Sequence, residues 1–297
     1  HSVDVDGRVV TAERILLCPG GWPSLPDVPG VQHAVTSNEI FHLEECPKRI
    51  LIVGGGYIAT EFVGIFNGLG SEVVQVYRGP LFMRGFDGDV RRFLAVEMRK
   101  KGVDLRFNLN VTAIHKQGSD YRVDFTEGES EIFDCVFFAT GRTPRTAGLG
   151  LSDVGIETDG NGAVIINDDF QTNVSSVYAV GDVVDRMALT PIALAEGMIL
   201  ANRLFHETDR DMNYDNVPTA VFSNPNIGTV GLSEDEALDR GLKVRIFTSS
   251  FRPMKHTMSG RNEKTFMKLV VDAETERVLG CHMVGPDAGE IIQGFGV

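Results

Sequence analysis

The sequence predicts an α/β protein in which a unit with a parallel sheet is followed by an α+β domain. Three observations lead to this fold class. The segment RILIVGGGYIATEFVGIFNGLGSEVVQVYR, residues 49–78, has the pattern of strand, tight glycine turn, amphipathic helix and second strand. The strand CVFFATGR continues this domain, and NGAVIIND and SVYAVGD resume a sheet further along the chain. From Val217 the pattern changes to short strands and the hairpin TFMKLVVDAETERVLGCHMVG, which is typical of an α+β domain.

Local signals define the remaining elements in order. RILLCPGG predicts a buried strand with a glycine turn, and PSLPDVPG a Pro-rich connection that cannot be helical. A helix is predicted over residues 89–102, and strands in DLRFNLNVTAI and YRVDFT. The segment TPIALAEGMILANRLF predicts a helix with Thr190 as N-cap and Pro191 in its first turn. Past Val217 we expect strands in AVFS, IGTVG and KVRIFTSSF, and a helix capped by Ser233 with Glu236 three residues on.

Composition limits the classes of function. A chain of 297 residues with 42% apolar content can bury one large core or several smaller ones. The 28 basic residues are outnumbered by 41 acidic ones, and this net charge of −13 argues against nucleic acid or a membrane as partner. An anionic ligand therefore needs a local basic pocket. No apolar run approaches the ~20 residues that span a bilayer, so we expect a soluble, cytoplasmic protein.

The cysteines and histidines do not predict a metal site. They are scattered through the chain without the spacing of metal ligands. We expect all four cysteines to be buried core thiols: Cys18, Cys46, Cys135 and Cys281. We expect His256 and His282 to lie on strand surfaces, and no histidine has a neighbour that suggests catalysis.

The first chemical motif is GGGYIA, in which Gly54, Gly56 and Ala59 have G-x-G-x-x-A spacing between a strand and a helix. Glycine permits the tight turn and the close approach of a pyrophosphate, and the small third residue lets helix and strand pack. The helix N-terminus supplies free N–H groups and positive potential. A purely structural glycine turn is the alternative, but the strand–turn–helix–strand context favours a dinucleotide site.

Two arginines follow the second strand of this unit, in VYRGPLFMRGF. NAD sites place an acid about twenty residues after the glycines, whereas an arginine there accommodates the additional phosphate of NADP. Here Arg78 ends the strand and Arg84 lies in the loop. Two guanidiniums can bind a dianionic 2′-phosphate through charge-assisted hydrogen bonds. The alternative is a pair of solvated surface arginines.

The second motif is VYAVGD, which places Asp182 just past a hydrophobic strand and eight residues before Thr190. A carboxylate there can accept hydrogen bonds from sugar-like hydroxyls, and a helix start can stabilise negative charge. Flavin chemistry needs both functions. Taken alone, however, the pattern is also ordinary turn chemistry.

Together these segments resemble the pyridine nucleotide-disulfide oxidoreductases, most closely the members that reduce glutathione disulfide. The resemblance spans nearly the whole chain and is carried by the order and spacing of GGGYIATEFVGIFNGLGSEV, VYRGPLFMRGFD, FFATGRTPRT, VYAVGDVVDRMALTPIALAEG, TAVFSNPNIGTVGLSEDEA and FRPMKHTMSG. It implies a Rossmann-like NADP-binding domain inserted in the remainder of an FAD-binding domain, followed by an α+β interface domain. The expected domains are a partial FAD-binding domain (1–47), the NADP-binding domain (48–145), a returning FAD-binding segment (146–216) and a partial dimerisation domain (217–297).

The resemblance also implies roles for single residues. It assigns NADP binding to Gly54, Gly56, Ala59, Arg78, Arg84 and Arg142. It makes Tyr57 the ring that covers the flavin until nicotinamide displaces it, and Glu61 a residue of the nicotinamide side. Asp182 and Thr190 would face the flavin. Without the resemblance, Tyr57 would be read as helix-face packing and Glu61 as an exposed helix charge; Phe222 could lie near the nicotinamide or be a buried strand aromatic.

Several family features are absent from these residues. The redox-active C-x4-C pair, the first glycine fingerprint and the C-terminal His-Glu pair are not present, so we expect the chain to be a fragment that does not reduce glutathione disulfide by itself and holds flavin poorly. Cys18-Pro19 and Trp22 replace the usual residues of the flavin segment. Met198 stands where some members carry an arginine toward glutathione, which leaves the disulfide substrate open.

The implied whole protein is an NADPH-dependent flavoprotein disulfide reductase with FAD and NADP as cofactors. Its expected partners are glutathione disulfide or a related small disulfide and a second copy of itself, with no nucleic acid and no membrane. Two alternatives stay open. One is another flavin disulfide reductase of mercuric or dihydrolipoamide type, although the latter would want an acid in place of Arg78. The other is a nucleotide-binding or dimerisation module without turnover.

Overall fold

The computed structural model describes residues 2–206 and 210–296. The chain forms two compact units, and each is built from two separate stretches of sequence. Unit 1 comprises His1–Ser24 and Arg142–Asn213, and unit 2 comprises Leu25–Gly141 and Tyr214–Val297. Unit 2 thus contains the expected dinucleotide-binding segment together with the C-terminal α+β segment.

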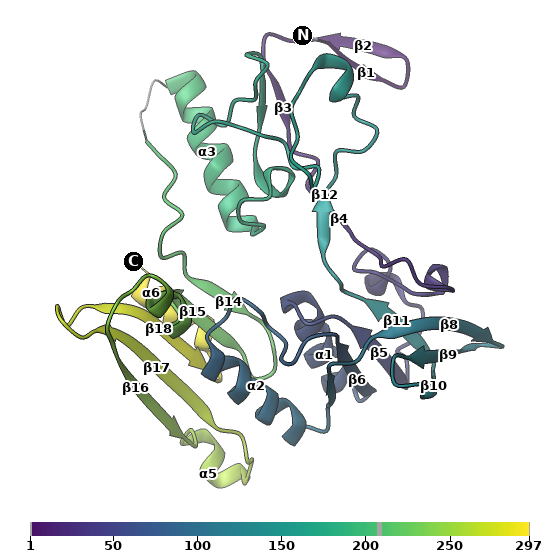
Figure 1. Cartoon of the computed structure of the whole chain (residues 1–297), viewed down its shortest axis with the longest axis vertical. Coiled ribbons are helices and arrows are strands. Elements are labelled where there is room, and N and C mark those ends of the chain that lie inside the picture. Colours follow the sequence, from purple (N-terminus) through teal and green to yellow (C-terminus); the bar gives the residue numbers. More distant parts are fainter. Residues whose placement is uncertain (1, 207–209, 297) are drawn as a thin grey trace. The chain divides into compact units, whose positions relative to one another are not determined.

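A four-stranded parallel sheet carries the glycine turn in unit 2, with strand order β11-β5-β6-β7 (Figure 1). In the first strand, β5, the four residues after Arg49 are apolar and buried, as expected for a parallel strand covered on both faces. Helices α1 and α2 make the crossovers that parallel pairing requires. The bounds are β5 (Arg49–Val53), α1 (Tyr57–Leu69), β6 (Glu72–Tyr77), α2 (Gly88–Lys100), β7 (Asp104–Phe107) and β11 (Cys135–Phe138).

Alternate residues of β5 enter two different cores, as the period of a strand dictates. Ile50 and Ile52 pack in the cluster that contains residues of α1 and α2, such as Phe62 and Leu94. The intervening residues pack on the other face, against a three-stranded antiparallel meander in place of a helix. The meander consists of β8 (Val111–Gln117), β9 (Asp120–Phe125) and β10 (Ser130–Phe133).

The C-terminal part of unit 2 is a five-stranded antiparallel sheet in the order β14-β15-β18-β17-β16 (Figure 1). The predicted hairpin is confirmed as β17 and β18, and the predicted capping box is present, with Ser233 and Glu236 bonding each other's backbone. The elements are β14 (Thr219–Val221), β15 (Ile227–Gly231), α4 (Glu234–Asp239), β16 (Val244–Phe251), α5 (Lys255–Ser259), β17 (Thr265–Asp272), β18 (Val278–Val284) and α6 (Ala288–Phe295).

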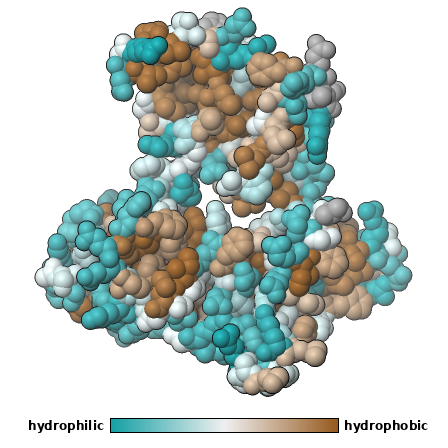
Figure 2. Space-filling model, turned by 180° about the vertical axis from the view of Figure 1, so that it is seen from behind, coloured by the Kyte–Doolittle hydropathy of each residue, from teal (hydrophilic) through white to brown (hydrophobic). Residues whose placement is uncertain are grey.

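Unit 1 is built from short strand pairs and one long helix. Its parallel pair β3–β13 packs against Val164 and Val183, and α3 packs through Ile199 and Leu200 against Phe170. The elements are β1 (Ser2–Val5), β2 (Arg8–Thr11), β3 (Ile15–Leu17), β4 (Gly21–Pro23), β12 (Arg142–Pro144), β13 (Val177–Ala179) and α3 (Thr190–His206). Large apolar side chains of α3 are exposed, and a hydrophobic area is visible on this unit's surface (Figure 2).

Some local predictions for unit 1 need correction. β3 is not a buried strand: Leu16 is 48% exposed, because β3 pairs only with β13 in its sheet. NGAVIIND forms only an isolated bridge between Thr158 and Val164. Helix α3 begins one residue early, since Leu189 accepts the first helical hydrogen bond from the N–H of Ala193, so Thr190 is not its N-cap.

The predictions for cysteines and histidines were partly wrong. Cys135 is buried, whereas Cys18 and Cys46 are exposed. Neither histidine lies on a strand surface: His256 is buried in α5, and His282 is buried on β18, a strand flanked by neighbours on both sides. His282 is accommodated because Thr229 and the carbonyl of Leu232 satisfy its two ring nitrogens. No helix in the described ranges is long and apolar enough to span a membrane.

Candidate functional site

The glycine turn lies at the carboxyl end of β5, beside the point where strand order reverses between β11 and β5. Gly54 has a φ of +150°, and a Cβ there would lie 2.3 Å from the carbonyl oxygen of Ala139. Only glycine fits this position. Its N–H donates to Val76 O at 2.9 Å, which ties the turn to β6.

Gly56 and Ala59 meet different requirements. Gly56 precedes α1 with extended backbone, and a Cβ there would meet nothing within 4 Å, so its open side leaves room for a ligand to approach the backbone. Ala59 is fully buried, as a small residue between helix and strand should be. The first turn of α1 contains no acidic residue that would offset its positive N-terminal potential. This cradle fits a phosphate group.

A buried glutamine supports the turn, and the sequence analysis missed it. Gln75 on β6 is fully buried, and its Nε2 donates to Gly54 O at 3.0 Å. A polar residue in the middle of an apolar parallel strand is the signal that could have revealed it, because buried amides need partners.

Arg78 and Arg84 follow β6, and both are exposed. Among the described residues, neither guanidinium has a hydrogen-bond or ion-pair partner. The described residues that follow β6, 78–86, include no acidic side chain of the kind that an NAD site carries there. Two unpaired cations therefore stand beside the glycine turn in a chain whose net charge is −13.

The loop between these arginines is fixed by its backbone. The N–H of Met83 donates to Gly55 O at 2.5 Å, and the N–H of Asn108 to Gly79 O at 3.0 Å. Within the loop, the side chains of Phe82 and Met83 are buried. Arg91 of α2 donates through Nε to Phe82 O at 2.7 Å and through Nη2 to Leu81 O at 2.6 Å.

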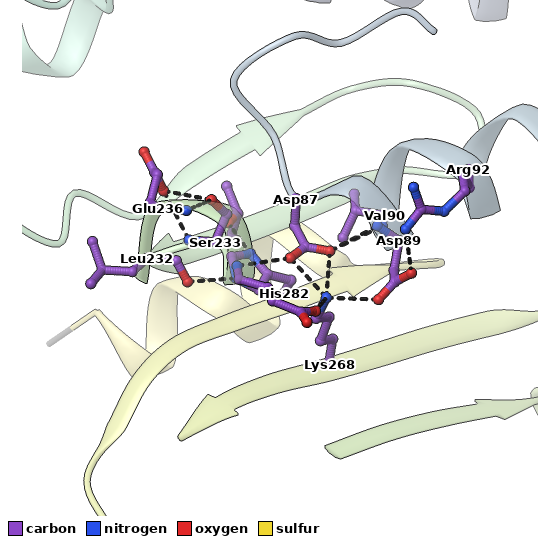
Figure 3. A network of polar contacts seen from close by, with 11 residues as sticks. Asp87, Asp89, Val90, Arg92, Leu232, Ser233, Glu236, Lys268 and His282 are labelled. Atoms are coloured by element: carbon purple, nitrogen blue, oxygen red, sulfur yellow. Dashed lines mark hydrogen bonds and ion pairs between the residues drawn. The ribbon is translucent and has the colours of Figure 1, made fainter. Parts of the chain in front are cut away.

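A buried ion cluster holds the start of α2 where the loop ends (Figure 3). Asp87 caps the helix by accepting from the N–H of Asp89 at 2.9 Å. Lys268 of β17 lies 2.9 Å from Asp87, 2.7 Å from Asp89 and 2.6 Å from Glu234. The side chains of Asp87 and Lys268 are almost wholly buried. The cluster therefore ties α2 to the C-terminal sheet.

The cluster keeps Asp87 and Lys268 charged. Burial favours neutral Asp87, but the hydrogen bond and charge of Lys268 outweigh it and hold the pKa of Asp87 below its usual value. Burial opposes the charge of Lys268 as well, yet the hydrogen bonds that its ammonium donates to Asp89, Glu234 and Asp87 raise the pKa of the ammonium above its usual range. His282 lies nearby, and burial lowers its pKa, which favours the neutral ring.

Tyr57 and Glu61 occupy the first two turns of α1, four residues apart. Tyr57 is 38% exposed, so it is not a buried packing residue. Glu61 is partly buried, and its Oε1 accepts a hydrogen bond from the N–H of Phe222 at 2.9 Å. Burial raises the pKa of Glu61 above its usual value, against the effect of this hydrogen bond. Phe222 is 69% exposed, which excludes a role as a buried strand aromatic.

The other predicted residues lie in unit 1. Arg142 is on β12 and donates through Nη2 to Gly21 O at 2.5 Å. Asp182 follows β13 in the short helical turn Gly181–Val184, and no described residue bonds to its carboxylate. Thr190 opens α3. Glu196 escaped the sequence analysis: it is buried, and its Oε2 accepts from the N–H of Gly181 at 2.7 Å, which fixes the turn beside Asp182.

The described part of the chain contains no cluster of ligands that could hold a metal ion. Unit 2 brings together the glycine turn, Tyr57, Glu61 and the two arginines. Among the described residues of unit 1, the unbonded carboxylate of Asp182 lies near the start of a helix and can accept hydrogen bonds from hydroxyl groups.

Comparison with known proteins agrees with these features. Residues 1–197 match the family described as pyridine nucleotide-disulphide oxidoreductase, and residues 217–297 match the dimerisation domain of the same family. The chain belongs to this family. The glycine turn after β5 lies in the segment that matches the oxidoreductase family. The five-stranded sheet lies in the segment that matches the dimerisation domain.

Curated relatives cover nearly all of this chain. Glutathione reductase of Burkholderia cepacia is 46% identical over 297 residues, which is 100% of this chain and 66% of the relative. The chloroplastic/mitochondrial glutathione reductase of Pisum sativum is 45% identical, with 100% of this chain and 54% of the relative covered. Trypanothione reductase of Leishmania donovani is 44% identical over 98% of this chain and 60% of the relative. The chain thus spans one half to two thirds of their length.

A solved structure has the same fold. The HOCl-induced flavoprotein disulfide reductase RclA from Escherichia coli superposes with a TM-score of 0.92 at 28% identity, over 100% of this chain and 69% of that one. The mixed α/β architecture predicted from the sequence is confirmed.

Proposed function

We propose that the whole protein is an NADPH-dependent, FAD-containing disulfide reductase whose substrate is glutathione disulfide or a related small disulfide. The names of the relatives that cover this chain support the substrate class. A dihydrolipoamide-type enzyme is disfavoured because Arg78 stands where an NAD-dependent member would carry an acid. The part contributed by unit 2 of this chain is the binding of NADPH.

The observation that carries the proposal is the pair of unpartnered guanidiniums after β6. An exposed arginine without a carboxylate partner contributes nothing to folding through ion pairing. Here two occur within one loop that is anchored to the phosphate-binding turn. A 2′-phosphate is the group of NADPH that needs two cations there.

Other residues take the roles that the family resemblance implies. Gly54, Gly56 and Ala59 admit the pyrophosphate to the start of α1. Tyr57 would be the ring that covers the flavin until nicotinamide displaces it, and Glu61 would help to hold the nicotinamide side. We propose that Arg142 also binds NADP.

FAD, when bound, supplies the acceptor of hydride and passes electrons to a disulfide. Asp182 would accept hydrogen bonds from its sugar-like hydroxyls, and the start of α3 at Thr190 would stabilise negative charge. The fit rests on the unbonded carboxylate of Asp182.

We also infer that the intact protein is a cytoplasmic homodimer, with the domains divided at residues 47, 145 and 216. The match of residues 217–297 to the family's dimerisation domain supports self-association. Sedimentation velocity of the intact protein tests this self-association. A well-behaved monomer at tens of micromolar, well above a dissociation constant of about 1 μM, would contradict the proposed homodimer.

Titration calorimetry of NADPH and NADH against the 297-residue chain tests the nucleotide assignment. Each guanidinium–phosphate contact contributes roughly 1.5 to 3 kcal/mol, less where salt and solvent reach it. Together they should favour NADPH by about 2 to 4 kcal/mol, or thirty-fold to a thousand-fold. The variant Arg78→Ala/Arg84→Ala should lose most of this preference and keep its affinity for NADH. Equal affinities in the wild type would refute the proposal.

A further inference from the structure

The loop that presents Arg84 is held by a second arginine that no ligand needs to touch. Arg91, in the first turns of α2, has a partly buried guanidinium. Its Nε and Nη2 donate to the carbonyls of Phe82 and Leu81 at 2.7 and 2.6 Å. Among the described residues it forms no ion pair. The guanidinium of Arg91 therefore interacts with main-chain carbonyls of the loop and with no described carboxylate.

These two bonds fix the segment immediately before Arg84. Met83, the next residue, has a φ of +57° and is itself tied to Gly55 by a hydrogen bond of 2.5 Å. The N–H of Phe86 then donates to Met83 O at 3.1 Å and closes a turn around Arg84 and Gly85, whose φ of +95° only glycine adopts readily. Arg84 thus stands at the tip of a turn whose base is held from two sides, by the glycine turn and by Arg91.

The two hydrogen bonds that Arg91 donates are charge-assisted, because the donor is a guanidinium. A guanidinium donating two parallel hydrogen bonds is geometrically specific, and charge-assisted bonds are stronger than neutral ones. Because Arg84 itself is exposed and unpartnered, its place relative to the glycine turn depends on the backbone beneath it. A binding group held within a fraction of an ångström needs such support from residues behind it.

We propose that Arg91 is a positioning residue for nucleotide specificity: it sets Arg84 at the distance from the glycine turn that the 2′-phosphate of NADPH requires. Arg91 does not itself contact the nucleotide. The inference rests on the proposed function, because it presupposes that Arg84 binds the 2′-phosphate. It predicts a long-range effect on discrimination between NADPH and NADH, and none on the shared part of the two nucleotides.

The chain offers a matched control on the same helix. Arg99, two turns further along α2, also donates to a main-chain carbonyl, that of Leu105, at 3.1 Å. Leu105 lies on β7, outside the arginine loop. Arg91→Met and Arg99→Met each remove a cationic donor and keep an apolar stem, so both test the loss of an arginine on α2, but only one touches the loop.

The experiment is a double-mutant cycle read as the ratio of the dissociation constants for NADH and NADPH. We expect Arg91→Met to lower this ratio by about three- to tenfold, less than the roughly hundredfold that a full 1 Å misplacement can cost, with the Kd for NADH unchanged. In the Arg84→Ala background the same substitution should leave the ratio unchanged. Arg99→Met should leave it unchanged in both backgrounds. Arg91→Lys should recover part of the preference, because lysine can still reach a carbonyl but without the fork.

Three outcomes would overturn the inference. An unchanged ratio in Arg91→Met, beside a lowered ratio in Arg84→Ala, would show that Arg84 needs no such support. An equal fall in the Arg84→Ala background, or a parallel weakening of NADH, would show that Arg91 only stabilises the fold. If Arg91→Met does not fold, Arg91→Lys carries the same comparison. A wild type without any preference for NADPH would instead refute the proposed function, so the two failures are distinguishable.

Discussion

At the scale of single residues, the carboxyl group of Glu61 both holds a main-chain N–H in place and has a raised pKa. It lies on α1 below the glycine turn and accepts a hydrogen bond from the main chain of Phe222, at the end of β14. Burial raises the pKa of its carboxyl. A carboxylate whose pKa is raised in the folded state costs stability once it ionises, so Glu61 is kept at some expense to the fold.

Glu61→Gln should therefore stabilise unit 2 at neutral pH. Glutamine keeps an oxygen for the N–H of Phe222 but cannot ionise. Because the folded pKa is raised, wild-type stability falls as pH rises from the unfolded value of about 4.3 through the folded one, and this fall should vanish in the variant. Hydrogen exchange of α1 amides between pH 4 and pH 8 measures it. The exposed Glu127→Gln serves as control, and an equal pH dependence in Glu61→Gln and wild type would contradict the expectation.

At the scale of elements, the arginine loop and α2 are positioned by partners far away in sequence. Asp87 caps α2 and meets Lys268, which is 181 positions further along the chain. The strands and helices around the glycine turn and the capping box could be predicted because their signals are local: apolar period, glycine at a turn, serine three residues before glutamate. The strand expected in NGAVIIND was wrong, since this segment forms only an isolated bridge. The ion cluster could not, since a lysine in an apolar strand gives no indication of which carboxylates it will meet.

Lys268→Met should destabilise this part of unit 2 by about 3 to 5 kcal/mol at pH 7, the cost of leaving a buried charge unpaired. The pKa of Asp87 is lowered in the folded state, so its ionised form contributes stability above the unfolded value of about 3.9, and this is lost as pH falls through the folded one. The deficit of the variant should thus narrow below about pH 4.

Hydrogen exchange of β17 amides reports the change directly. Lys243→Met is the matched control, because Lys243 pairs with Glu274 in an exposed ion pair of 3.0 Å, for which we expect less than about 1 kcal/mol. Similar losses in the two variants would show that burial of the Lys268 cluster confers no special energetic role.

At the scale of the whole molecule, the net charge of the chain restricts where an anionic nucleotide can bind. The chain carries a net charge of −13 yet is proposed to bind a multiply anionic nucleotide, so the basic groups must be local. The α/β fold and the arginine pair could be predicted from order and spacing alone. The supporting residues Arg91 and Glu196 could not, because each acts through a hydrogen bond to a backbone group whose position only the fold defines. For Gln75 the sequence gives a signal, a polar residue inside an apolar strand, but not its partner, the carbonyl of Gly54.

The central claim is that Arg78 and Arg84 hold the 2′-phosphate, and phosphorus NMR of bound NADP tests it most directly. The second pKa of a free phosphate monoester is about 6. Two nearby cations favour the dianion, so the 2′-phosphate pKa should fall when the nucleotide binds the wild-type chain and should stay near its free value in Arg78→Ala/Arg84→Ala. If binding moves the pyrophosphate resonances while the 2′-phosphate keeps its free shift and pKa, the claim is wrong.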